Sequence, residues 1–237
     1  MALSRIVLLR HSESIANVAS EKAERLGQDR ILSDYRDADV PLTEHGIDQA
    51  KALALWWHSG TRSPGDSTNF TSPYLRARQT LEIGLSLSED DELVMIDERL
   101  RDRELGILEL LTSRGVERLH PEEAARRRHL GPFYYRPPGG ESWADIALRV
   151  RSFLRDVDTR DREGTLLIAC HDAVVSVFLY VCLGMTETEL LQFCETHPVT
   201  NASLTELVRS AEGRWLLSTF ADVGHLSDVA ATQKRSD

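Results

Sequence analysis

Residues 5–17 read RIVLLRHSESIAN, and they join a short apolar segment to a group of polar side chains. The first five residues, RIVLL, are typical of a buried strand in a parallel sheet. Arg10 and His11 follow this strand directly, and a polar, helix-permissive segment runs from Ser14 to about Leu26. Ligands of open parallel sheets bind beyond the carboxyl ends of the strands. Arg10 and His11 are therefore the first candidates for a functional site.

Two further predicted strands end in comparable residues. Residues 165–170 (TLLIAC) have the pattern of a buried strand, and His171 follows them at once. Another short strand precedes the segment SPYLRARQT, in which Ser72 is predicted to cap a helix with the following proline in its first turn. Arg76 then lies in the opening turns of that helix. Three strand ends thus carry two arginines and two histidines.

The rest of the chain alternates between helical and strand patterns. Such alternation predicts an α/β fold in three layers, with a central, mainly parallel sheet flanked by helices on both faces. Residues 1–227 are predicted to form one domain and residues 228–237 a flexible tail. The other expected elements are a helix capped by Thr43, a strand at 93–96, mixed loop and helix over 101–140, an amphipathic helix from Trp143 to Val157, a helix with a capping box of Thr186 and Glu189, and a closing pair of strands at 203–208 and 214–220.

The composition excludes several classes of partner. The net charge is -10 and no long basic stripe appears, so no nucleic-acid partner is expected. The most apolar later segment, 173–183, is too short to cross a bilayer, so no membrane partner is expected. The cysteine count is three, outside any CxxC pair, which argues against a disulfide framework and a zinc site. With no signal-peptide pattern at the amino terminus, a cytoplasmic location is predicted.

The residues at the strand ends have the properties that phosphate chemistry requires. A neutral histidine ring carries a lone pair that can accept a phosphoryl group. Arginine presents a planar set of donors that matches phosphate oxygens, and a helix amino terminus adds backbone donors. A second histidine, when protonated, adds positive charge. Because these groups supply the charge, we expect a small phosphorylated ligand, no metal and no cofactor.

Six segments, in order along the chain, resemble blocks of the histidine phosphatase superfamily, the phosphoglycerate-mutase-like group: LLRHSESIAN, LTEHGIDQA, TSPYLRARQT, LRDRELG, GGES and ACHDAVV. The resemblance runs from about Arg5 to His225. It implies a phosphoglycerate-mutase-like α/β fold, with His11 as the residue that becomes phosphorylated. The residues that it implies around the phosphate or the substrate are Arg10, Asn17, Arg76, His171, Glu141 and Ser142.

Three positions depart from the family's usual pattern. Ser12 replaces the usual glycine after the histidine, which implies altered backbone geometry or an added hydroxyl. Asp102 stands where the family has its acidic proton donor, commonly a glutamate that is one methylene longer. Asp172 follows the second histidine, where another branch of the family uses an aspartate as donor, although capping of the next helix explains it equally well. Because the leaving alkoxide needs a proton from an acid, we rank Asp102 first, Asp172 second and Glu104 third.

The segment 129–150 resembles a subgroup of small members with broad or poorly defined phosphatase activity. Phe133, Tyr134 and Tyr135 are candidates for a wall of the substrate pocket, with core packing as the alternative for the two tyrosines. Arg136 is a candidate for binding a second anionic group of the substrate.

Together these features predict a metal-independent phosphatase that hydrolyses a small phosphate monoester through a phosphohistidine on His11. One alternative is a phosphoglycerate mutase, which generally carries additional chain after the LRDRELG block to shield the phosphoenzyme from water. The other is a non-catalytic, protein-binding member of the fold, against which the four retained pocket residues argue. The physiological substrate and the oligomeric state, a homodimer included, are left open.

Overall fold

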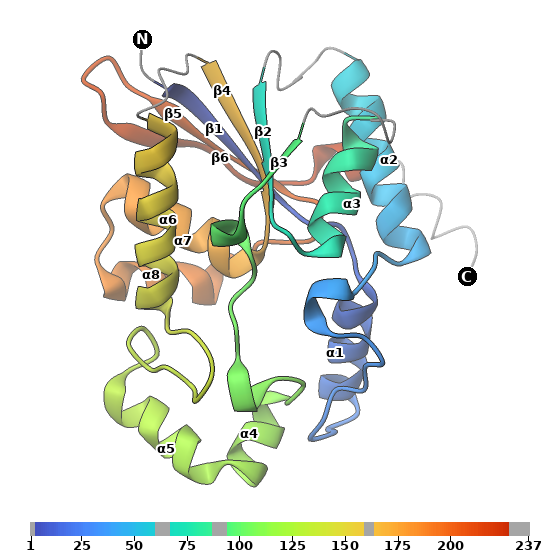
Figure 1. The fold of residues 1–237 in the computed structure, drawn as a ribbon, viewed down its shortest axis with the longest axis vertical. Coiled ribbons are helices and arrows are strands. Elements are labelled where there is room, and N and C mark those ends of the chain that lie inside the picture. The colour runs from blue at the N-terminus through green and yellow to red at the C-terminus, as the bar shows by residue number, and fades with distance from the viewer. Residues whose placement is uncertain (1–2, 60–66, 87–93, 159–163, 228–237) are drawn as a thin grey trace.

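A six-stranded sheet organises the protein (Figure 1). The computed structural model describes residues 3–59, 67–86, 94–158 and 164–227. The strand order is β3-β2-β4-β1-β5-β6, in which β1 pairs in parallel with β4, β4 with β2 and β2 with β3, while β5 and β6 are antiparallel. The strands are β1 (Leu3–Arg10), β2 (Ser67–Thr71), β3 (Val94–Ile96), β4 (Gly164–Cys170), β5 (Leu204–Arg209) and β6 (Trp215–Asp222).

Helices cover both faces of the sheet, which confirms the predicted three-layer α/β fold. In Figure 1, α2 and α3 lie on one side of the strands, and α6, α7 and α8 lie on the other. The helices α1, α4 and α5 lie beyond the carboxyl ends of the parallel strands. Their bounds are α1 (Ile15–Arg25), α2 (Glu44–His58), α3 (Leu75–Gly84), α4 (Ser113–Leu119), α5 (Pro121–Leu130), α6 (Trp143–Asp158), α7 (Asp172–Leu183) and α8 (Glu187–Thr196).

Two clusters of buried hydrophobic residues lie on the two faces of the sheet. Along β1, Ile6 and Leu8 belong to the cluster that includes α6 and α7, whereas Val7 and Leu9 belong to the cluster that includes α2 and α3. Successive side chains of a strand point to opposite faces, so a continuous apolar run is what a strand buried on both faces requires. The run RIVLL therefore forms a central strand with helices on both sides.

Most of the predicted helix starts are confirmed. Thr43 accepts a hydrogen bond from the Gly46 N–H at the start of α2, and Thr186 forms a capping box with Glu189 at the start of α8. The closing pair of strands is also present as β5 and β6. The predicted tail at 228–237 lies outside the described residues.

The predicted cap at Ser72 is wrong. Helix α3 begins at Leu75, with Tyr74 as its N-cap, so Ser72 and the following proline precede the helix. The Ser72 hydroxyl instead lies 2.8 Å from Nε2 of His171 and accepts a hydrogen bond from the Tyr74 N–H. A tertiary contact with His171 therefore determines the position of this serine.

Two connecting segments meet beyond the sheet's carboxyl edge. The Ile31 N–H donates to the Leu110 carbonyl (2.9 Å), and the Thr112 N–H donates to the Asp29 carbonyl (3.2 Å). The region 101–140 contains the short 3-10 helix η3 (Gly106–Leu108) before α4 and α5, as the expected mixture of loop and helix predicts. The segment before α2 contains another, η1 (Asp37–Asp39). Within the described ranges, no helix has both the length and the apolar character that crossing a membrane requires.

Candidate active site

The two histidines meet at the carboxyl edge of the sheet. His11 follows β1 and His171 follows β4, and these strands are neighbours. The His11 N–H donates to the Cys170 carbonyl (3.0 Å), which continues the strand pairing up to the site. Both rings are buried, and their centroids lie 5.2 Å apart. The predicted juxtaposition therefore follows directly from the parallel pairing of β1 with β4.

His11 has the state that a nucleophile needs. Its Nδ1 lies 2.8 Å from the carbonyl oxygen of Ser12, so Nδ1 carries the proton and donates it to that oxygen. Burial first, and then the positive charges of His171 and the neighbouring arginines, hold the pKa of His11 well below its ordinary value. The ring is therefore neutral at pH 7, and its lone pair lies on Nε2.

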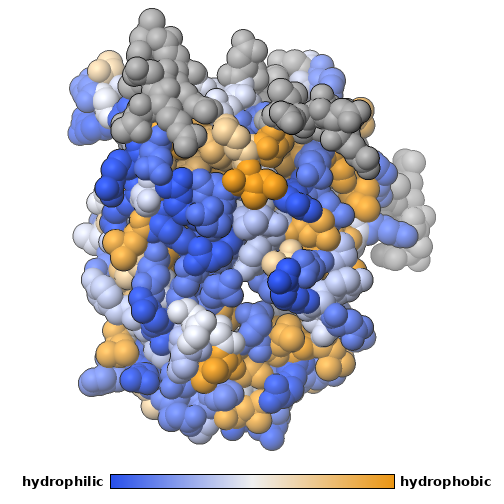
Figure 2. Space-filling model, in the orientation of Figure 1, coloured by the Kyte–Doolittle hydropathy of each residue, from blue (hydrophilic) through white to orange (hydrophobic). Residues whose placement is uncertain are grey.

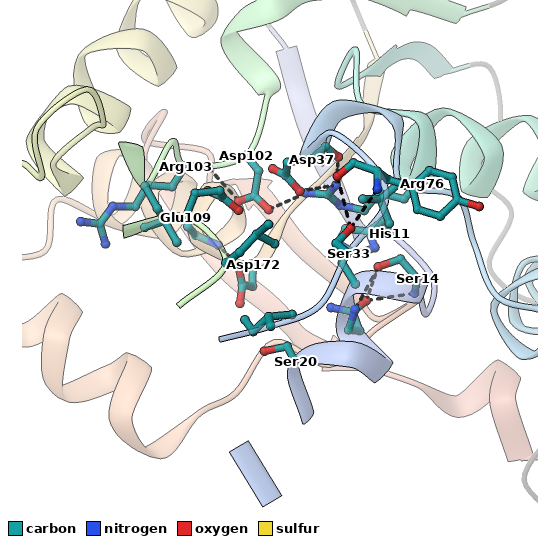
Figure 3. Close-up of a pocket in the computed structure, with 18 of the residues that line it drawn as sticks. His11, Ser14, Ser20, Ser33, Asp37, Arg76, Asp102, Arg103, Glu109 and Asp172 are labelled. Carbon is teal, nitrogen blue, oxygen red and sulfur yellow. Dashed lines mark hydrogen bonds and ion pairs between the residues drawn. The ribbon is translucent and has the colours of Figure 1, made fainter. Parts of the chain in front are cut away.

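Arg76 supplies a buried cation from the first turn of α3. Its guanidinium donates to the Asp37 carbonyl (2.6 Å) and to the Asp37 carboxylate (2.9 Å) through Nη1. Its Nη2 donates to Asp102 (3.0 Å), and the guanidinium also lies 5.0 Å from the centre of the Tyr74 ring. Two carboxylates thus hold this arginine in place before any substrate arrives (Figure 3).

Arg10 and Asn17 present further donors at the same end of the site. Arg10 donates through Nη1 to the Val199 carbonyl, while its Nε is buried without a hydrogen-bond partner. The Asn17 oxygen accepts from Ser14 and from Asn201 (3.1 Å), which leaves the Asn17 amide nitrogen as a donor. An unpaired buried donor is costly unless a ligand satisfies it, so this arrangement suits an anion.

His171 is held between two elements. Its Nε2 lies 2.8 Å from the Ser72 hydroxyl, and its Nδ1 lies 3.2 Å from a carboxylate oxygen of Asp102. The Tyr74 ring packs against it edge-on, with 5.3 Å between centroids. The ring orientation of His171 is therefore determined on three sides.

Asp102 is surrounded by positive charge and hydrogen-bond donors. It accepts from Arg76 and from the Arg103 N–H (2.8 Å), and it lies beside His171. Burial by itself would raise the pKa of Asp102, but His171, Arg76 and the backbone donor outweigh it and hold this pKa well below the ordinary value. In the ligand-free protein Asp102 is therefore a carboxylate.

The other two candidate acids have different surroundings. Glu104 accepts from the Tyr74 hydroxyl (2.7 Å) and lies outside the cavity lining. Asp172 is the first residue of α7, lines the cavity and accepts from the Ala173 N–H (2.6 Å). In Figure 3, Asp102 is joined to Arg76 by a dashed line, while Asp172 lies apart from both. Asp102 is thus the candidate acid that contacts Arg76 and His171.

A cavity of about 420 Å³ opens beside these residues. In the space-filling view, the face shown is hollowed between the part that contains the sheet and the part that contains α4 and α5 (Figure 2). Figure 3 shows His11, Arg76, Asp102 and Asp172 around the cavity. Its lining is completed by Arg10, Ser14, Ala16, Asn17, Ser20, Ile31, Ser33, Tyr35, Asp37, Val40, Arg103, Leu105, Glu109, Leu110, Trp143 and Ala173.

Glu141 and Ser142 lie outside this lining and hold the loop that carries Asp102. Glu141 accepts from Arg101 (2.5 Å) and from Arg149 (3.1 Å), and Arg149 also donates to the Asp102 carbonyl (3.1 Å). Ser142 forms reciprocal hydrogen bonds with Asp145 in the first turn of α6. The hydrogen bonds of Glu141 and Ser142 position the loop and α6. Contact of these two residues with substrate stays a prediction.

The glycine of the LRDRELG block, Gly106, is required for steric reasons. Gly106 has a φ of 56°, and a Cβ at this position would lie 2.1 Å from the Pro138 carbonyl oxygen. Only glycine fits such a position without displacing the backbone. The close approach brings the loop that carries Asp102 against the PPGG segment.

The expected roles of the aromatic run and of Arg136 are wrong. Phe133 and Tyr135 are buried away from the cavity lining, Tyr134 is exposed, and Tyr135 donates its hydroxyl to Glu123 (2.8 Å). Arg136 pairs with Asp145 and also lies outside the lining. The segment turns toward α5 and α6, so packing and ion pairing account for these residues.

Ser12, which departs from the family's usual glycine, has an ordinary backbone conformation. Ser12 is buried, has no positive φ, and donates its N–H to the Thr80 hydroxyl (2.9 Å), which in turn donates to the Arg76 carbonyl (2.7 Å). The Ser12 hydroxyl itself has no partner among the described residues. The backbone conformation at position 12 is therefore one that residues other than glycine can adopt.

Several residues of the site carry no recognisable signal in the sequence. Asp37 and Glu109 lie in connecting segments without a regular pattern, and Asn201 donates to the His11 carbonyl (3.0 Å) from a loop late in the chain. Arg103 lines the cavity next to Asp102. Arg103 differs from the others in that it belongs to the LRDRELG block.

Comparison with known proteins gives a consistent family assignment. A sequence model of the histidine phosphatase superfamily (branch 1) matches residues 6–222. A probable phosphoglycerate mutase of Proteus mirabilis is 29% identical over 95% of this chain and 96% of that protein. A phosphoglycerate mutase-like protein of Arabidopsis thaliana is 33% identical over 76% of this chain, which spans 66% of that protein's length.

Solved structures support the fold. The structure of a putative alpha-ribazole-5'-P phosphatase from Escherichia coli matches with a TM-score of 0.73 and 21% identity, over 93% of this chain and 97% of that one. A mycobacterial glucosyl-3-phosphoglycerate phosphatase in complex with inorganic phosphate matches with a TM-score of 0.69 and 22% identity, over 94% of this chain and 100% of that one.

Proposed function

Because the chain belongs to the histidine phosphatase superfamily (branch 1), we propose that it hydrolyses a small phosphate monoester through a phosphohistidine formed on His11. The observation that carries this proposal is the state of His11. The ring is neutral, and its Nε2 lone pair is free in an open cavity that Arg10 and Arg76 also line. His171 lies outside this lining, and its buried ring packs 5.2 Å from the His11 ring between centroids. A nucleophile and cations for the phosphoryl oxygens are therefore assembled at one place.

The first step transfers the phosphoryl group to the protein. Nε2 of His11 attacks phosphorus, and the bond from phosphorus to the ester oxygen breaks. Arg10, Arg76 and His171 stabilise the charge on the phosphoryl oxygens, as electrostatic catalysis of phosphoryl transfer requires. These side chains supply the positive charge, so we expect turnover to persist in the presence of a chelator such as EDTA.

The leaving oxygen takes its proton from Asp102 in this scheme. A bound phosphate dianion shares Arg76 and His171 with Asp102, and it adds negative charge beside the carboxylate. Like charges at close range favour protonation of one partner, so substrate binding raises the pKa of Asp102 and converts it from carboxylate to acid. In the second step a water attacks the phosphohistidine, the N–P bond breaks, and Asp102 takes the proton of that water.

Proton uptake on anion binding is a direct consequence. We expect wild-type protein at pH 7 to take up more protons on binding inorganic phosphate than Asp102→Asn does, because Asp102 is ionised only in the free state. Calorimetric titration in buffers of different ionisation enthalpy measures the uptake for both proteins. Equal uptake would exclude the proposed change in the protonation of Asp102.

The identity of the acid is tested through the leaving group. Asp102→Asn is expected to lower kcat about 10²- to 10³-fold for an alkyl phosphate, and less than about tenfold for p-nitrophenyl phosphate, because the second leaving group needs little protonation. Asp172→Asn and Glu104→Gln are the matched comparisons. Asp172 is the donor if Asp102→Asn lowers kcat equally for both esters while Asp172→Asn lowers kcat much more for the alkyl phosphate than for p-nitrophenyl phosphate.

A phosphoglycerate mutase is the second candidate function, since relatives of this chain carry that name. Incubation with 3-phosphoglycerate separates the two activities. Release of inorganic phosphate supports the phosphatase, and formation of 2-phosphoglycerate supports the mutase. A phosphate-release screen over sugar phosphates, nucleotides and phosphoamino acids then tests the hydrolase on other esters, and its failure on every ester would overturn the proposal.

A further inference from the structure

The cavity extends beyond the phosphate-binding end, and apolar side chains form one part of its outer walls. Ile31 and Tyr35 come from the segment before α2, and Leu105 and Leu110 come from the segment before α4. The two segments are joined by the hydrogen bond between the Ile31 N–H and the Leu110 carbonyl. Trp143, at the start of α6, completes the lining on this side. The alcohol part of a substrate therefore meets aliphatic and aromatic surface.

The charged groups in the lining are more acidic than basic. Four carboxylates line the cavity: Asp37, Asp102, Glu109 and Asp172. Three arginines accompany them, but Arg76 is already paired with Asp37 and Asp102. Glu109 and Asp172 have no ion-pair partner within the described part of the chain.

Of the three arginines in the described lining, Arg103 is directed away from the phosphate end. Arg103 donates through Nε to the Glu141 carbonyl (2.9 Å), and in Figure 3 its guanidinium points away from Arg76 and His11. Arg136, which the sequence suggested for a second anion, is paired with Asp145 outside the lining. Positive charge is therefore concentrated at the phosphate end of the cavity.

Burial and neighbouring negative charges both act on Glu109. Partial burial raises the pKa of Glu109 first, and then the negative charges of Asp37, Asp102 and Glu104 contribute, to a value of about 7. The contribution of these three carboxylates is the part that acts on a ligand as well, because negative charges near Glu109 disfavour a second anion at the same place.

We propose that the site accepts phosphate monoesters whose alcohol part is apolar and carries no second anionic group, with Glu109 as the residue that rejects a carboxylate or a second phosphate. The inference rests on the proposed hydrolase and names its substrate class. A phosphoglycerate would bring its carboxylate against a wall that already holds unpaired negative charge. An ester of an uncharged alcohol would meet no such repulsion.

Three esters test this class. Propyl phosphate has an apolar alcohol, glycerol 3-phosphate has an uncharged polar alcohol, and 3-phosphoglycerate differs from the second chiefly by a carboxylate in place of a hydroxymethyl group. We expect kcat/KM at pH 8 to fall in that order, with about a tenfold or greater gap between the last two. The inhibition constant of each ester against p-nitrophenyl phosphate is measured in parallel, so that binding is compared even where turnover is slow.

Glu109→Gln removes the charge and keeps the shape. We expect it to raise the ratio of kcat/KM for 3-phosphoglycerate to that for glycerol 3-phosphate about three- to fivefold. Glu212→Gln, an exposed glutamate outside the cavity lining, is the matched control and should leave the ratio unchanged.

The outcomes separate this inference from the proposed function. If wild-type protein hydrolyses all three esters through a phosphoenzyme but with equal kcat/KM, or if Glu109→Gln leaves the ratio unchanged, the substrate class is wrong and the hydrolase stands. If no ester is hydrolysed, none inhibits and no phosphoenzyme forms, both proposals fail.

Discussion

Replacing His11 by alanine is expected to lower turnover at least about 10⁴-fold, because the step that forms the intermediate loses its nucleophile. The backbone at this position makes its hydrogen bonds to Cys170, Ala202 and Asn201 through main-chain atoms, and alanine retains all of them. The loss of activity should therefore occur without loss of the fold. Phosphate release and thermal unfolding followed by circular dichroism measure the two quantities.

The same variant has a chemical readout. Rapid acid-free quenching of wild-type protein with a ³²P-labelled ester should give an acid-labile, base-stable protein label, as expected for a phosphoramidate, and His11→Ala should give none. His129→Ala on the exposed end of α5 is the matched control and should keep both label and turnover. Wild-type turnover by His11→Ala would show that another residue accepts the phosphoryl group.

Replacing Arg76 by glutamine is expected to have two large effects. Turnover should fall about 10³-fold or more, because a planar cation that contacts the phosphoryl oxygens is lost. The free energy of unfolding should fall by about 3–5 kcal/mol, because Asp37 and Asp102 would face each other without the cation that pairs both. Urea denaturation measures the stability, and phosphate release measures the activity.

A second substitution separates the two effects. In the double variant Arg76→Gln with Asp37→Asn, one of the two unpaired charges is removed, so part of the lost stability should return while turnover stays low. Full recovery of turnover in the double variant would mean that Arg76 acts only by neutralising Asp37. An unchanged free energy of unfolding in the single variant would mean that the buried ion pairs contribute nothing to the fold.

Features encoded in local sequence were predictable. The run RIVLL is apolar at every position that β1 buries against two helical layers, and Thr43 and Thr186 cap the helices that they precede. The proximity of the residues that follow the strands was also predictable, since parallel strands place their carboxyl ends along one edge of the sheet. That geometry brings His11 beside His171, although 160 residues separate them.

Features that depend on packing between distant segments were not predictable. Ser72 has the sequence pattern of a helix cap, yet its hydroxyl contacts His171, because the end of β2 lies beside the end of β4. The aromatic run at 133–135 follows the pocket blocks in sequence but packs away from the cavity lining. In both cases a contact made only in the folded protein outweighs the local preference.

The sequence by itself determined the alternation of strands and helices along the chain, the strand ends and the group of side chains that we propose to bind phosphate, above all His11. Only the tertiary structure decided the protonation of those groups and the sign of charge in the outer cavity. His11 is neutral because burial and cations surround it, Asp102 is ionised because it lies between Arg76 and His171, and Glu109 faces other carboxylates. The pKa of a side chain depends on charges and burial at distances of a few ångströms, and those distances are set by loops that carry no periodic signal in the sequence.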